Sequence, residues 1–129
     1  MKRVTGIGGI FFKANDPEQL RDWYAKHLQL PKLGGTVFKW RDQDDPKCER
    51  YTVRSPFEAS TDYFEPSKKP YMINFIVENL DATLDQLRGE GVTVADRRDE
   101  SEFGKFGWIM DPEGNRIELS EPPAQTSET

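Results

Sequence analysis

Apolar residues recur along the chain at two spacings, one typical of strands and one typical of helices. Residues 5–14 are rich in Ile, Phe and Gly and predict a buried strand. Asp16 is a favourable N-cap, and Pro17 suits the first helical position. Apolar residues then continue at helical spacing up to Leu30. The chain is therefore predicted to begin with a strand and an amphipathic helix.

The remainder of the first half predicts short strands separated by turn-rich stretches. The expected strands cover residues 36–41, 50–54 and 61–64, and a linker follows at residues 66–70. In the second half, residues 71–78 predict a strand, and Asn79 can cap a helix that continues through Arg88. Three more strands are expected at residues 92–97, 105–110 and 116–121, with a hairpin turn over residues 111–115.

The order of elements in the second half therefore repeats the order in the first half. Shifting the chain by about 63 positions brings strand onto strand and Asn79 onto Asp16. We predict an α+β fold with two βαβββ modules, residues 4–65 and 71–121, in one domain of residues 1–121. Residues 122–129 are polar and are predicted to form a disordered tail.

Composition and charge narrow the classes of function. The chain has 129 residues, 15 of them aromatic, and a net charge of −5. The acidic balance and the lack of a Lys or Arg cluster argue against nucleic acid or a membrane surface as a partner. The single cysteine, Cys48, cannot form an intramolecular disulfide, and no apolar run approaches the roughly 20 residues that span a bilayer. These features lead us to expect a cytoplasmic protein.

Three stretches together resemble the vicinal oxygen chelate superfamily, the glyoxalase, bleomycin-resistance and dioxygenase group. They are residues 9–28, residues 72–94 and, most specifically, the motif Trp108-Ile-Met-Asp-Pro-Glu-Gly-Asn-Arg-Ile-Glu-Leu119. The resemblance implies eight strands in two half-barrels of mixed sheet that enclose a cavity. It also implies a homodimer and a small-molecule ligand.

The metal ligands implied by the resemblance are mostly absent. Glu118 occupies the ligand position on the final strand, but Gly9 and Met72 occupy the usual ligand positions on the first strand of each module. A catalytic metal site wants at least three protein donors, and His27 is the only histidine. The sequence argues against an extradiol dioxygenase. Cofactor identity stays open, with a poorly supported divalent metal as the candidate.

Strand alternation and the resemblance select the candidate site residues. Glu118 is the candidate catalytic or anchoring group: alternation alone favours a surface residue of an amphipathic strand, and the resemblance reverses that preference. The candidate ligand-binding residues are Phe11, Trp40, Met72, Asn74 and Trp108, and ordinary core packing would need the same aromatic residues.

Two functions follow from this set. The first is a glyoxalase-like protein that binds a small organic molecule in an aromatic and acidic cavity, either without turnover or as an isomerase or lyase. The second is a sequestering protein like the bleomycin-resistance proteins, which needs no metal of its own. Whether the chain is an enzyme is left open by the sequence.

Overall fold

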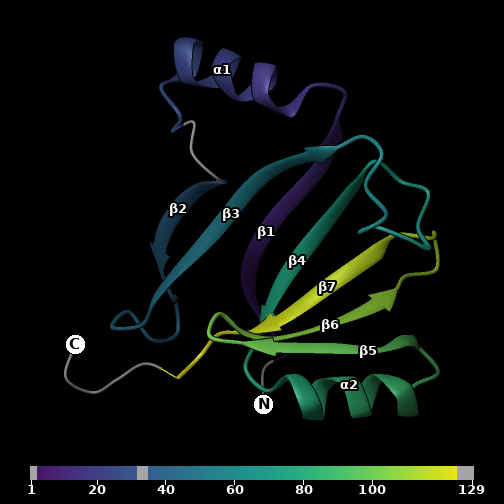
Figure 1. The fold of residues 1–129 in the computed structure, drawn as a ribbon. Helices are drawn as coiled ribbons and strands as arrows, with labels where there is room; N and C mark the ends of the chain where they lie inside the picture. The colour runs from purple at the N-terminus through teal and green to yellow at the C-terminus, as the bar shows by residue number, and fades with distance from the viewer. Residues whose placement is uncertain (1–2, 32–34, 125–129) are drawn as a thin grey trace.

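A computed structural model describes residues 3–31 and 35–124. One mixed sheet of seven strands, ordered β2-β3-β1-β4-β7-β6-β5, carries the fold, with a helix at each end (Figure 1). The elements in chain order are β1 (Val4–Ala14), α1 (Pro17–Leu28), β2 (Thr36–Arg41), β3 (Glu49–Glu58), β4 (Tyr71–Val77), α2 (Leu80–Gly89), β5 (Thr93–Ser101), β6 (Gly104–Met110) and β7 (Arg116–Glu121). The α+β class and the mixed sheet predicted from the sequence are confirmed.

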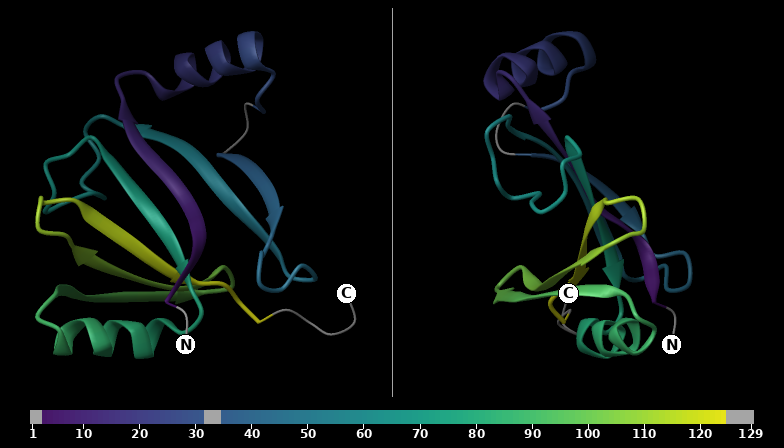
Figure 2. Two further views of the ribbon diagram at one scale, coloured as in Figure 1. Left: turned by 180° about the vertical axis from the view of Figure 1, so that it is seen from behind. Right: turned by 90° about the vertical axis from the view of Figure 1, so that its right-hand side faces the viewer.

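The two halves of the chain join edge to edge in the middle of this sheet. Strands β1 and β4 pair antiparallel, while the parallel pairs β1–β3 and β4–β7 lie one in each half. The register aligns Gly9 with Val53 on one side and with Asn74 on the other, and Asn74 with Glu118. Figure 2 shows that the sheet is strongly twisted, so that β2 and β5 at its edges point in different directions. Four neighbouring strands thus bring residues distant in sequence to one level of the sheet.

Both helices begin as their capping residues predict. The side chain of Asp16 accepts a hydrogen bond from the backbone of Gln19 at 3.0 Å, and Asn79 does the same for Ala82 at 3.0 Å. The hairpin between β6 and β7 is also confirmed, since the Asp111 side chain accepts from two backbone N–H groups of the turn. No helix within residues 3–31 and 35–124 is long and apolar enough to cross a membrane.

The buried apolar residues form two clusters. Helix α2 contributes one of them by packing on β4 and β7, through Val77, Leu80, Leu84 and Leu119. The other cluster lies on the face of the sheet opposite α2 and contains Phe64, Met72 and Trp108. Phe64 reaches it from the segment between β3 and β4.

The strand predicted at residues 61–64 does not form. These residues lie in turns, held by backbone hydrogen bonds from Glu65 to Asp62 and from Ser67 to Phe64, both at 3.0 Å. Strand β3 is also longer than predicted and continues through Ser55 to Glu58. The reason is packing: neighbouring aromatic residues Tyr63 and Phe64 both contact the Phe57 ring, which strand alternation would prevent. The first half therefore has three strands within the described residues.

Candidate functional site

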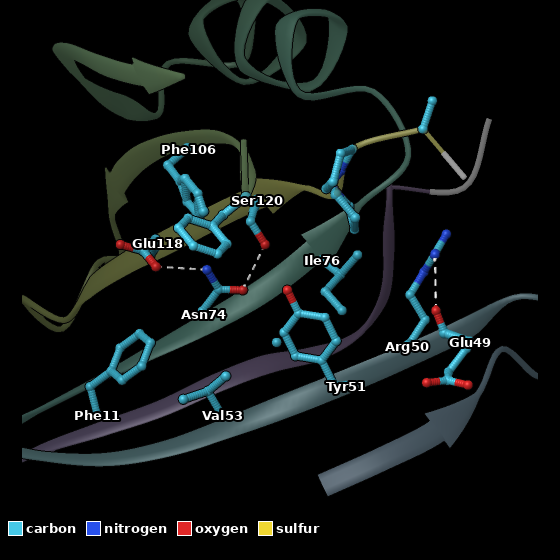
Figure 3. A pocket seen from close by; sticks show the side chains of 15 residues that line it. Phe11, Glu49, Arg50, Tyr51, Val53, Asn74, Ile76, Phe106, Glu118 and Ser120 are labelled. Carbon is cyan, nitrogen blue, oxygen red and sulfur yellow. Dashed lines mark hydrogen bonds between the residues drawn. The ribbon is translucent and has the colours of Figure 1, made fainter. Parts of the chain in front are cut away.

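A cavity of about 520 Å³ lies between the strands of the two halves (Figure 3). This volume suits a small organic ligand. Its apolar wall includes Phe11, Tyr51, Val53, Ile76, Phe103 and Phe106. Its polar side chains are Glu49, Arg50, Asn74, Glu118 and Ser120. The wall is mainly aromatic and aliphatic, with a few convergent polar groups.

Glu118 is the most highly organised polar group of the cavity. The residue is 3% exposed, and its carboxylate accepts hydrogen bonds from Asn74 Nδ2 at 2.7 Å, from Trp108 Nε1 at 3.0 Å and from the Tyr63 hydroxyl. Ser120 in turn donates to Asn74 Oδ1 at 2.9 Å. Figure 3 shows these hydrogen bonds, which connect Ser120 to Asn74 and Asn74 to Glu118 along one edge of the cavity. Buried charge is tolerated here because three donors satisfy it.

The guanidinium of Arg116 and two aromatic rings lie close to the Glu118 carboxylate. The Arg116 guanidinium lies 4.9 Å from the Trp108 ring centre and 5.8 Å from that of Tyr63, and Nη1 donates to the Tyr63 carbonyl. Burial lowers the pKa of Arg116 from its ordinary value, against the charge of Glu118. Burial, and next the negative charge of Glu118, raise the pKa of the Tyr63 hydroxyl, which therefore stays protonated and remains a donor.

Three of the candidate residues line the cavity and three lie outside its wall. Phe11, Asn74 and Glu118 face it. Trp108 and Met72 lie behind it, buried together with Phe64, although the Trp108 indole N–H still reaches Glu118.

Trp40 lies elsewhere. It donates from Nε1 to Thr52 Oγ1 at 2.9 Å, and its ring covers Gly6, where an added Cβ would collide with it. Contrary to expectation, the cavity lining does not include Trp40, Met72 or Trp108. Met72 and Trp108 are buried with Phe64, whereas Trp40 is half-buried and packs over Gly6.

Sequence reasoning missed several groups that now belong to the site. Ser120 was signalled by its alternation with Glu118 on one strand, but Tyr63 was not, because its position depends on a long turn-rich segment. Gly8 is also part of the wall, and a Cβ there would collide with the Asn74 side chain. The tail was expected to be disordered from residue 122, yet Pro122, Pro123 and Ala124 line the cavity. Residues 125–129 of that tail lie outside the described residues.

Comparison with protein families gives a match over nearly the whole chain. A model of the glyoxalase-like domain matches residues 9–120. The chain belongs to this family. It is a glyoxalase-like member of the vicinal oxygen chelate superfamily, as the motif ending at Leu119 indicated. No curated protein matches the chain.

Several solved structures have a similar fold, and they include an epimerase from two organisms and a dehydrogenase. A variant of methylmalonyl-CoA epimerase from Streptomyces coelicolor, in complex with 2-nitronate-propionyl-CoA, is 18% identical with a TM-score of 0.68, covering 96% of this chain and 99% of that chain. The Mycobacterium tuberculosis epimerase is 19% identical with a TM-score of 0.59, covering 100% and 95%. A Legionella pneumophila NAD-dependent benzaldehyde dehydrogenase is 12% identical with a TM-score of 0.56, covering 89% and 98%. At these identities the likeness establishes the glyoxalase-like fold and leaves its chemistry to the site.

The site of this glyoxalase-like domain does not fit the divalent metal that its superfamily implies. The aligned positions on β3, β1, β4 and β7 are Val53, Gly9, Asn74 and Glu118, so the register places Asn74 rather than Met72 beside Glu118. Only Glu118 provides a carboxylate, and both of its oxygens already accept hydrogen bonds. Within the described ranges no three His, Cys, Asp or Glu side chains lie together. A three-donor metal centre therefore lacks its ligands here.

Proposed function

We propose that this glyoxalase-like domain binds a small, largely aromatic organic molecule in its cavity and retains it without chemical change. The observation that carries the proposal is the Glu118 carboxylate, which three protein donors hold in place at the edge of an apolar cavity. An ionised carboxylate has about four acceptor positions, and three are occupied. One position is left to accept a hydrogen bond from a ligand.

This arrangement favours binding over proton abstraction. Glu118 Oε2 accepts from both Tyr63 and Trp108, and Oε1 accepts from Asn74. A proton taken from a ligand would have to displace or weaken one of these charge-assisted hydrogen bonds. As an acceptor, the same carboxylate works without any change in the network. Glu118 is therefore better suited to anchor a hydroxyl or N–H group than to serve as a base.

The remaining wall provides the apolar part of the binding energy. Phe11 and Phe106 lie on opposite sides of Asn74 in Figure 3, and Val53, Tyr51 and Ile76 extend the surface away from Glu118. Aromatic side chains such as these recognise flat molecules by stacking and by burying apolar area. The predicted ligand is accordingly a planar, mostly apolar molecule with one donor group.

Binding can be tested with 2-naphthol, which has a flat two-ring body and a single hydroxyl. Isothermal titration calorimetry with the full chain is expected to show saturable binding with one site per protomer. Val53→Phe fills the cavity and is expected to abolish binding. Val37→Phe is the matched control, because Val37 pairs with Val53 across β2 and β3 but does not line the cavity. Equal binding by both variants, or no binding of 2-naphthol to the wild type, would contradict the proposal.

A proton-transfer isomerase is the second candidate function. It is favoured by Asn74, whose amide lies beside Glu118 in the cavity and can donate to the oxygen of an enolate. The test is exchange of the acidic α-protons of 2-tetralone in deuterium oxide, followed by nuclear magnetic resonance. Exchange faster than in buffer that is lost in Glu118→Gln would support the enzyme, whereas binding without accelerated exchange would support retention.

A further inference from the structure

One arginine of the cavity wall has an unused hydrogen-bonding capacity. Arg50 is half-buried, and its Nε atom is buried without a hydrogen-bond partner. Its Nη1 atom donates only to the backbone carbonyl of Glu49, at a long 3.4 Å. Buried donors are nearly always paired in native structures, so the Arg50 guanidinium is not satisfied as that of a structural arginine is. Protein atoms enclose Nε itself, so a ligand would meet the terminal Nη atoms of the guanidinium.

Arg50 also has no carboxylate partner among the residues that the structure describes. The nearest acidic side chain in sequence, Glu49, pairs instead with Lys39 at 3.7 Å. An arginine with a free edge of its guanidinium is suited to bind a planar anion through two parallel hydrogen bonds. The cavity therefore has a cationic group that forms no ion pair with a carboxylate in residues 3–31 and 35–124.

The position of Arg50 sets the length of a ligand that could use it together with Glu118. Val53 lies at the level of Gly9, Asn74 and Glu118 in the sheet, and Arg50 precedes Val53 by three residues on β3. Three residues of strand span about 10 Å, and three strand spacings of about 4.8 Å separate β3 from β7. Figure 3 shows the Arg50 and Glu118 side chains at opposite sides of the cavity, with Tyr51 and Ile76 between them. A ligand that uses both groups therefore has to extend across the cavity, which favours an elongated two-ring body over a single ring.

We infer that the ligand of this cavity is an aromatic monocarboxylate, with its acid group on Arg50 and its hydrogen-bond donor on Glu118. The inference rests on the proposed binding function and specifies the class of ligand. A single negative charge is favoured over a phosphate or a multiply charged acid, because one arginine faces the ligand while Glu49 and the net charge of −5 repel further anionic charge. The apolar wall between the two polar groups requires the centre of the ligand to be apolar.

The test compares two probes that differ only in the acid group, 2-naphthol and 6-hydroxy-2-naphthoate. Isothermal titration calorimetry with the wild type is expected to give at least about tenfold tighter binding of the acid, the size of one charge-assisted hydrogen bond. Arg50→Met is expected to remove this preference, so that the variant binds the acid no more tightly than it binds 2-naphthol. Arg50→Lys keeps the charge without the planar fork and should retain part of the preference.

Arg21 provides a matched control. Its Nε atom is likewise buried without a partner, but Arg21 does not line the cavity and donates from Nη2 to the Pro56 carbonyl at 3.3 Å. Arg21→Met should therefore keep the preference for the acid. Equal affinity of the wild type for the two probes, or a preference that survives Arg50→Met, would overturn the inference while leaving the proposed binding function intact. If neither probe binds, the proposed function fails and the inference fails with it.

Discussion

The two helices of the chain begin in the same way and end up in different surroundings. Both have a capping side chain that accepts a hydrogen bond from the third helical residue. Helix α2 buries Leu80 and Leu84 completely against the sheet. In α1 the only buried residue is Pro17, while Trp23 and Leu28 remain 51% and 55% exposed. An amphipathic pattern thus fixes which face of a helix is apolar, but the packing partner decides how much of it is buried.

The two halves of the chain also contribute different kinds of side chain to the site. In the cavity wall, Asn74, Glu118 and Ser120 are linked by hydrogen bonds, and all three lie on β4 and β7, which contribute to the apolar cluster under α2. The wall contributed by β3 includes side chains that are half-buried or exposed, such as those of Arg50 and Tyr51. The second half therefore fixes the polar anchor, and the first half provides the more adjustable wall.

Two leucine truncations test this contrast in packing. Leu84→Ala removes a fully buried side chain from the cluster under α2 and is expected to lower the free energy of unfolding by about 3 kcal/mol. Leu28→Ala removes the same atoms from an exposed site at the end of α1 and should change it by less than about 0.5 kcal/mol. Urea unfolding followed by circular dichroism measures both. A similar loss in both variants would mean that α1 is packed as firmly as α2.

Two glycines provide a second contrast, between the cavity wall and an open helix end. A Cβ at Gly8 would collide with the side chains of Asn74 and Ile76, and Asn74 cannot move away without breaking its bonds to Glu118 and Ser120. Gly8→Ala is expected to cost about 2 kcal/mol and to weaken 2-naphthol binding. At Gly89 in α2 nothing lies within 4 Å of an added Cβ.

Gly89→Ala is the control, and it should leave binding unchanged and stabilise the fold by up to about 1 kcal/mol through helix propensity. Urea unfolding and calorimetry report on both variants. If Gly8→Ala binds the probe as well as the wild type does, the position of Asn74 is less constrained than its hydrogen bonds indicate.

The sequence predicted the parts of the fold that depend on local rules. Asp16 and Asn79 mark helix starts, and the turn at residues 111–115 fixes the register that makes Glu118 point into the cavity. Asn74 was found because alternation on β4 is undisturbed from Met72 to Ile76. These predictions need only neighbours in the sequence, and the structure places their residues accordingly.

The failed predictions concern side chains whose surroundings come from distant segments. Tyr63 and Phe64 were assigned to a strand, whereas they turn back to cover Met72 and to reach Glu118. Met72 has the right face for the cavity, but it is covered by Phe64 from a loop that no periodicity describes. Trp40 alternates correctly on β2 and yet packs over Gly6, because an unsubstituted glycine leaves room for its ring. Local patterns therefore predict which face of a strand a side chain occupies, but not which distant residues pack over that side chain.

The smallest expected effect concerns Tyr63, whose hydroxyl donates a hydrogen bond from the first half of the chain to Glu118. Tyr63→Phe removes one of three donors to the carboxylate and should lower the free energy of unfolding by about 1.5 kcal/mol at pH 7. Because the pKa of Tyr63 is raised in the folded protein, its hydroxyl stabilises the fold fully below the unfolded-state value of about 10. As the pH rises above that value, the unfolded chain loses the proton first, so the stabilisation declines. The difference in unfolding free energy between the wild type and Tyr63→Phe, measured in urea from pH 7 to 11, should be constant to about pH 9 and then shrink. A difference that stays constant to pH 11 would mean that Tyr63 titrates as it does in the unfolded chain and that its bond to Glu118 is weak.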